Sequence, residues 1–140
     1  WRQSQLEYTW LRSISGEHTD FWAITQDGLD WAMEASGLED PDLRERLLAL
    51  YWKLSAYPEV PAILARLKAA GMTCAILSNG SPAMLEGAVE SAGLHGYLDG
   101  LLSVESVGIF KPHKKVYDLV GAEFACIPEQ VLFVSSNTWE

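Results

Sequence analysis

Small polar side chains and one lysine follow the apolar runs of this sequence, at places where strands would end. Ser78 and Asn79 follow one apolar run, Lys111 lies in a loop after a second, and residues 135–137 (Ser-Ser-Asn) follow a third. The carboxyl ends of parallel strands share one sheet edge, so the pattern predicts that these groups gather there. Hydroxyl, amide and ammonium groups at one edge can hold an anion. Taken singly, Ser78 or Ser135 is more typical of a strand-terminal turn.

Helices that alternate with short apolar runs after residue 56 are expected to position these groups. Such alternation predicts an α/β fold, in which a parallel sheet is built through right-handed crossovers. Gly71 and Gly93 mark helix ends, and Pro112 is expected as the first residue of the last helix. The predicted helices span residues 58–70, 81–92 and 112–124, and the predicted strands span residues 72–77, 101–104 and 131–134.

The first 56 residues have a different pattern, in which amphipathic helices follow one another with no strand between them. Predicted helices cover residues 1–14, 19–36 and 41–54, which indicates a helical-bundle subdomain. In the first of them, an apolar face at helical spacing is formed by Leu6, Trp10, Leu11 and Ile14. We therefore expect a helical subdomain over 1–56 and an α/β core over 57–140.

Composition excludes several classes of function. The chain has 140 residues, 49% of them hydrophobic, which supports a folded core. Its formal charge of −9 disfavours binding to nucleic acid or to an anionic membrane. Cys74 and Cys126 lie far apart and suit a reducing compartment. No apolar run is long enough to cross a bilayer, so a cytoplasmic protein is expected.

The two ends of the sequence suggest a piece of a longer protein. The chain begins at Trp1 without an initiator methionine and stops at Glu140, directly after a predicted strand. We therefore expect further segments on both sides.

Several motifs together resemble the haloacid dehalogenase superfamily and, within it, the L-2-haloacid dehalogenases, over essentially the whole chain. Residues 1–12 are similar to the opening cap helix of those enzymes, and residues 77–81 (Leu-Ser-Asn-Gly-Ser) to their second motif. Residues 110–112 (Phe-Lys-Pro) resemble the third motif, and residues 133–139 resemble the fourth. The resemblance implies a Rossmann-like core that lacks its first strand here, with a helical cap.

A nucleophilic displacement is what this resemblance implies. An aspartate attacks C2 of a short (S)-2-haloalkanoic acid, halide leaves with inversion, and water hydrolyses the aspartyl ester to an (R)-2-hydroxy acid. That aspartate belongs to the first core strand, upstream of Trp1. The implied partners are the small-molecule substrate and its halide product, with no cofactor and no metal ion.

The resemblance also carries roles to individual residues. Arg2 and Asn79 would receive the halide, and Ser78 would bind the substrate carboxylate. Lys111 would keep the nucleophile ionised, with Tyr117 in support. On spacing alone, Arg2 is equally a solvated cap residue and Tyr117 an ordinary helix residue.

The remaining site positions come from the same resemblance. Leu6 and Phe21 fit core packing as well as substrate contact. The family's fourth motif usually ends in Asp, whereas this chain has Glu140, whose extra methylene would displace the carboxylate. Ser135 and Asn137 would orient the nucleophile and the water, Glu140 would act with them, and Gln3, Leu6, Phe21 and Trp139 would line the pocket.

Two alternatives and one partner remain open. A magnesium-dependent phosphatase of the same superfamily would need an acidic metal ligand where Ser136 stands, because hard cations prefer carboxylate oxygens. The second alternative is that this chain, taken alone, is a catalytically inert fragment whose strand edges are unpaired. Trp10, Trp22 and Trp31 in the cap would supply surface for a homodimer of the full-length parent.

Overall fold

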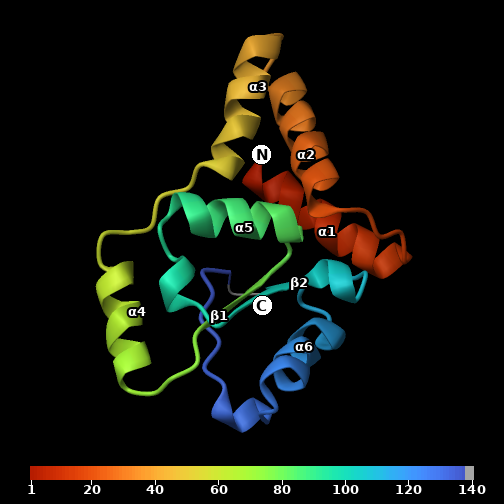
Figure 1. Ribbon diagram of the computed structural model, residues 1–140. Helices are drawn as coiled ribbons and strands as arrows, with labels where there is room; N and C mark the ends of the chain where they lie inside the picture. Colours follow the sequence, from red (N-terminus) through yellow and green to blue (C-terminus); the bar gives the residue numbers. More distant parts are fainter. Residues whose placement is uncertain (138–140) are drawn as a thin grey trace.

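The computed structural model describes residues 1–137, and Figure 1 shows how its elements are arranged. Helices α1 to α3 form one side of the molecule, α4 and α6 flank the small sheet, and α5 lies between the two parts. The α-helices are α1 (Arg2–Ser15), α2 (Phe21–Ala35), α3 (Pro41–Ala49), α4 (Val60–Ala69), α5 (Pro82–Ser91) and α6 (Lys114–Phe124). Short 3-10 helices are η1 (Leu50–Trp52), η2 (His95–Tyr97), η3 (Val104–Ser106) and η4 (Pro128–Gln130).

Side-chain caps fix where several helices begin. Asp20, Asp40 and Ser81 accept the backbone N–H three residues on, at 3.0, 2.9 and 3.4 Å, before α2, α3 and α5 respectively. The prediction that Pro112 begins the last helix is wrong. His113 is extended and caps α6 by accepting the N–H of Lys115 at its Nδ1, so the helix starts at Lys114.

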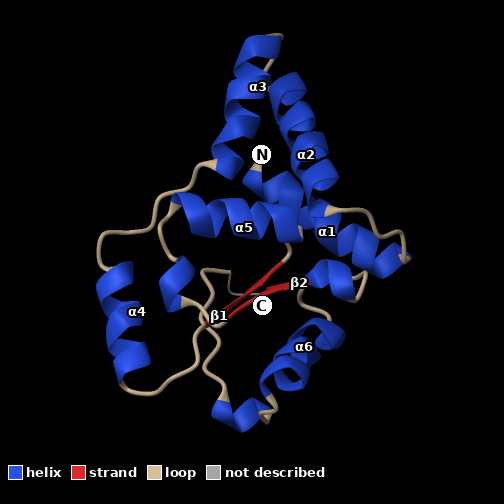
Figure 2. Cartoon of the chain, in the orientation of Figure 1, coloured by secondary structure: helices blue, strands red, loops and turns tan. Residues whose placement is uncertain are grey.

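The sheet consists of β1 (Ala75–Ser78) and β2 (Gly100–Ser103), which run parallel (Figure 2). Their register pairs Ala75 with Gly100 and Ser78 with Ser103, so the carboxyl ends of both strands lie side by side. The connection between them contains α5, which confirms the predicted strand–helix–strand unit. The first strand is shorter than predicted, and Cys74 lies just before it, half-buried.

The predicted strand at residues 131–134 is wrong: this segment is not in a ladder. Among residues 1–137 the two strands pair only with each other, and no third strand lies beside residues 131–134 to complete a ladder. Leu132 and Val134 are 84% and 82% exposed as a consequence. A strand-like sequence forms a strand only where a neighbour supplies the other half of the ladder.

The apolar face predicted for α1 is wrong in its second half, although Leu6 and Trp10 are half-buried. Leu11 and Ile14 are 61% and 84% exposed, whereas the buried residues of this helix are Ser4, Gln5 and Thr9. The cause is a close crossing with α2, where a Cβ on Gly28 would lie 3.3 Å from the backbone nitrogen of Gln5. At that distance only short or hydrogen-bonded side chains fit between the helices.

One buried cluster joins the two parts of the chain. It takes residues from α2, α5, α6 and the segment after β2, so helices before and after residue 56 share one core. Its members are Phe21, Ile24, Met84, Val104, Phe110 and Val116. Within residues 1–137, no helix combines the length and apolarity required to cross a bilayer.

Candidate functional site

The turn after β1 is fixed by hydroxyl groups from both strands. Ser78 Oγ accepts the N–H of Gly80 at 3.0 Å, and Ser103 Oγ donates to the carbonyl of Gly80 at 2.7 Å. Asn79 lies between Ser78 and Gly80 in the sequence and is 7% exposed. The serine that ends each strand therefore holds the turn and orients the Asn79 amide.

Lys111 lies against this turn. Its backbone N–H donates to Asn79 Oδ1 at 3.0 Å, and the residue is 9% exposed. Its Nζ is 5.5 Å from the ring centroid of Phe133, and the Tyr117 ring meets Phe133 edge-on at 5.6 Å. The structure thus brings Asn79, Lys111 and Tyr117 together, and the ammonium of a largely buried lysine favours a carboxylate or another anion beside it.

The residues after Phe133 follow directly on the contact that Phe133 makes with Lys111 and Tyr117. Ser135 is exposed, Asn137 is half-buried, and the Asn137 N–H donates to Ser135 Oγ at 3.0 Å. Phe133 links this segment to both Lys111 and Tyr117. The predicted site residues Trp139 and Glu140 lie outside the described residues.

Arg2 is tied to a polar network between helices. It is exposed, and its guanidinium donates to Gln5 Oε1 at 2.7 Å. Gln5 Nε2 in turn donates to Thr25 Oγ1 at 2.7 Å and to the Tyr51 hydroxyl at 3.2 Å. Within residues 1–137, Arg2 is therefore anchored to α1, α2 and η1 and makes no direct bond to the Asn79–Lys111 pair.

Three further predicted positions are distributed around the cap. Gln3 is exposed and donates to Glu7 Oε1 at 2.8 Å, and Leu6 is half-buried. Phe21 is 7% exposed within the shared core, where its ring lies 6.3 Å from that of Phe110. In this structure Phe21 therefore packs in the hydrophobic core, which is one of the two roles predicted for it.

One surface groove lies away from the predicted site. It lies between α1 and α2 and is lined by Tyr8, Arg12, Asp27 and Trp31 among others, without Arg2 or Lys111. Among the described residues there is also no group of three or more His, Cys, Asp or Glu side chains placed to hold a metal ion.

Sequence reasoning missed the residues that connect the two parts of the chain. Gln5 has no apolar character, yet it is fully buried, and His18 contacts Glu105 across the boundary between cap and core. The available signal for Gln5 was its spacing of four from Thr9, which places both on one helix face. No sequence signal pairs His18 with Glu105, because 86 residues separate them.

Comparison with known proteins identifies the class. A family model described as haloacid dehalogenase-like hydrolase matches residues 5–140. The chain belongs to this family of hydrolases.

Relatives within the family are named dehalogenases. The chain is 48% identical to (S)-2-haloacid dehalogenase 1 of Pseudomonas sp. (strain CBS-3), covering 100% of this chain and 62% of that protein. It is 41% identical to (S)-2-haloacid dehalogenase 4A of Burkholderia cepacia, covering 100% of this chain and 61% of the relative.

Solved structures agree in fold. L-2-haloacid dehalogenase from Xanthobacter autotrophicus, with chloropropionic acid covalently bound, superposes with a TM-score of 0.90 at 42% identity. The match covers 99% of this chain and 56% of that one. The chain thus spans less than two thirds of the length of these relatives. The superposition confirms the predicted fold class, an incomplete Rossmann-like core with a helical cap.

Proposed function

We propose that the protein containing this chain hydrolyses short (S)-2-haloalkanoic acids to (R)-2-hydroxy acids through an aspartyl ester. The observation that carries the proposal is the buried residue Lys111, whose backbone N–H is held by Asn79 at the carboxyl end of β1. Support comes from relatives named (S)-2-haloacid dehalogenase at 48% and 41% identity. The relative solved with covalently bound chloropropionic acid is consistent with an ester intermediate.

The proposed reaction has two displacements. A carboxylate oxygen of the nucleophilic aspartate forms a bond to C2 as the carbon–halogen bond breaks, and halide leaves with its electron pair. Water then attacks the ester carbonyl, which releases the 2-hydroxy acid and a proton and restores the carboxylate. We assign that aspartate to a segment upstream of Trp1, outside this sequence.

Lys111 supplies the positive charge for the nucleophile. A cation within a few ångströms lowers the free energy of the ionised carboxylate, and burial strengthens this effect because water screens it less. Asn79 and Arg2 would donate to the departing halide, and Ser78 would donate to the substrate carboxylate. Arg2 would reach the halide from the helix end that Gln5 anchors.

The other roles are proposed on the same basis. Tyr117 would support Lys111, which it approaches through Phe133. Ser135 and Asn137 would orient the ester and the water, and Glu140 would assist them. Pocket-lining roles are proposed for Gln3, Leu6, Phe21 and Trp139.

The wider description is also a proposal. We infer a metal-independent enzyme, because Ser136 replaces the acidic side chain that a bound cation would prefer. We infer that it is cytoplasmic, because Cys74 and Cys126 are free thiols, which suits a reducing compartment. We propose residues 1–56 as the cap subdomain and 57–140 as the core. A homodimer through the cap would cover Trp31, which is 53% exposed.

Halide release from (S)-2-chloropropionate by the intact protein tests the proposal. We expect turnover with the (S) substrate, none with the (R) form, and a loss of about a hundredfold or more in kcat for Lys111→Met. Lys115→Met, an exposed lysine of α6, is the matched control and should retain full activity. Phosphate release from a phosphomonoester with Mg²⁺, without halide release, would instead identify a phosphatase.

A further inference from the structure

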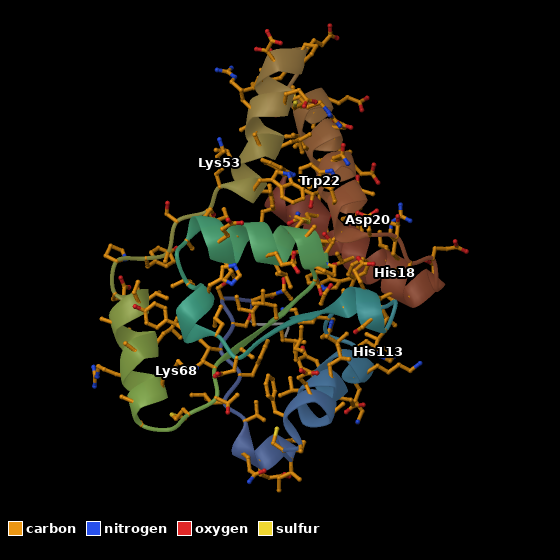
Figure 3. The ribbon with its side chains drawn as sticks, in the orientation of Figure 1. His18, Asp20, Trp22, Lys53, Lys68 and His113 are labelled. Carbon is orange, nitrogen blue, oxygen red and sulfur yellow. The ribbon has the colours of Figure 1, made fainter. Side chains whose placement is uncertain are left out.

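We infer that His18 and Glu105 form a clamp between cap and core, and that His18 is a positioning residue for Lys111. His18 lies in the loop between α1 and α2, and Glu105 lies in η3, directly after β2. Figure 3 labels His18 at the turn that faces the core. The role for Lys111 rests on the proposed function, whereas the clamp itself does not.

Phe110, the residue before Lys111, is held from the cap side. Its side chain is fully buried, and the His18 ring lies over it with centroids 4.7 Å apart and planes inclined by 37°. Its backbone N–H donates to Ser13 Oγ in α1 at 3.3 Å. The next N–H, that of Lys111, donates to Asn79 in the core. Contacts from cap and core therefore meet at two consecutive residues.

Glu105 connects the same histidine to the turn that carries Asn79. His18 Nε2 lies 3.4 Å from Glu105 Oε2, and about a quarter of each side chain is exposed (25% and 26%). The N–H of Glu105 donates to Ser103 Oγ, which itself donates to Gly80. His18 thus contacts both flanks of the site, the Lys111 loop through its ring and the Asn79 turn through Glu105.

The second carboxylate oxygen explains why the pair matters. Glu105 Oε1 is buried and has no hydrogen-bond partner among the described residues. A carboxylate in that position depends on the partner of its other oxygen, because burying an unpaired charged group is unfavourable. Removing the His18 ring would leave Glu105 without this bond and favour its movement toward water.

Other charged groups around the histidine do not replace this bond. Arg12 lines the small crevice that His18 shares with Phe110, but its guanidinium contacts the Glu17 carbonyl and Asp27. The carboxylate of Asp20 caps α2. A protonated Nε2 donates to Glu105 in both the cationic imidazole and one neutral tautomer, so the clamp does not require a charged ring.

Hydrogen exchange at the amides of Phe110 and Lys111 in the intact protein tests the clamp. His18→Phe keeps an aromatic ring beside Phe110 but cannot bond to Glu105. Glu105→Ala removes the carboxylate that His18 contacts. We expect each variant to accelerate exchange at both amides by roughly tenfold, with no further increase in the double variant and no change in β1 and β2. His95→Phe, at an exposed histidine of η2, is the matched control.

Each result of this experiment decides the inference. Unchanged exchange in the single variants, or additive effects in the double variant, would overturn it, and Glu105→Ala is decisive alone if His18→Phe does not fold. In the halide-release assay, both variants should lower kcat with little change in KM, and Glu105→Gln, which retains an acceptor oxygen, should restore it. If the unmodified protein releases no halide, the proposed function is wrong. The hydrogen-exchange result would still test whether His18 and Glu105 hold the Lys111 loop.

Discussion

Asp99 joins three segments through one carboxylate. One oxygen accepts from the Lys68 ammonium of α4, and the other accepts the N–H of Cys74, just before β1. These two contacts, the Lys68 bond first, hold the pKa of Asp99 below its ordinary value. The folded state therefore binds this proton less readily than the unfolded chain does, so the carboxylate stabilises the fold when ionised.

Lys68→Met should weaken the fold in a pH-dependent way. The contribution of Asp99 is complete above its unfolded pKa of about 3.9 and is lost as the pH falls through the lowered folded value. We expect the variant to be less stable than the parent near neutral pH. The difference in the free energy of unfolding should narrow in acid, as Asp99 becomes protonated in both proteins. Urea unfolding across this range measures it, with Lys53→Met, at an exposed lysine, as control. A gap that stays constant with pH would contradict this account.

At the scale of elements, the α1–α2 crossing decides where Arg2 is presented. Gly28 allows the two helices to approach, and Gln5 then bonds across the interface to Thr25 and Tyr51. The indole N–H of Trp1 adds a bond to the Thr25 carbonyl at 2.9 Å. The first turn of α1 is thus fixed to α2 and η1 by polar contacts rather than by an apolar seam.

Gly28→Ala should separate these helices slightly. The added Cβ would lie 3.3 Å from the Gln5 nitrogen, which is backbone and cannot rotate away. We expect a loss of about 1–3 kcal/mol in the free energy of unfolding. Gly96→Ala is the matched control, since a Cβ there meets nothing within 4 Å. Equal stability of the two variants would show that the crossing tolerates the methyl group.

For the whole molecule, the exposed apolar segment at residues 131–134 has the largest consequence. Leu132 and Val134 face water, and within the described residues β1 pairs only with β2. Unpaired strand edges with apolar side chains promote association between chains. The intact protein is expected to cover these edges with further chain.

Residues 1–140 expressed alone should therefore self-associate and lack dehalogenase activity. Leu132→Lys should reduce the association measured by sedimentation velocity, because a charge in an exposed apolar segment opposes its pairing with another chain. Ile14→Lys is closely matched, since Ile14 and Leu132 are both 84% exposed, but it lies in a helix and should have little effect. A monomeric, cooperatively unfolding chain with turnover would refute the expectation.

Local sequence signals predicted the helices and the proximity of Asn79 to Lys111, because both depend on short-range physics. Capping by Asp20 or Ser81 involves residues three apart, and a parallel strand unit brings Asn79 and the Lys111 loop to one edge. The class of protein followed from motifs at the same positions. The failures lie where a distant partner decides the outcome.

By itself, then, the sequence determined the α/β alternation, the grouping of Asn79 with Lys111 and the family. Tertiary structure alone decided that α1 buries Gln5 rather than Leu11, and that His18 meets Glu105. These outcomes depend on the distance between helices and on which groups are left to bond, and neither quantity is encoded in the spacing of residues along one segment.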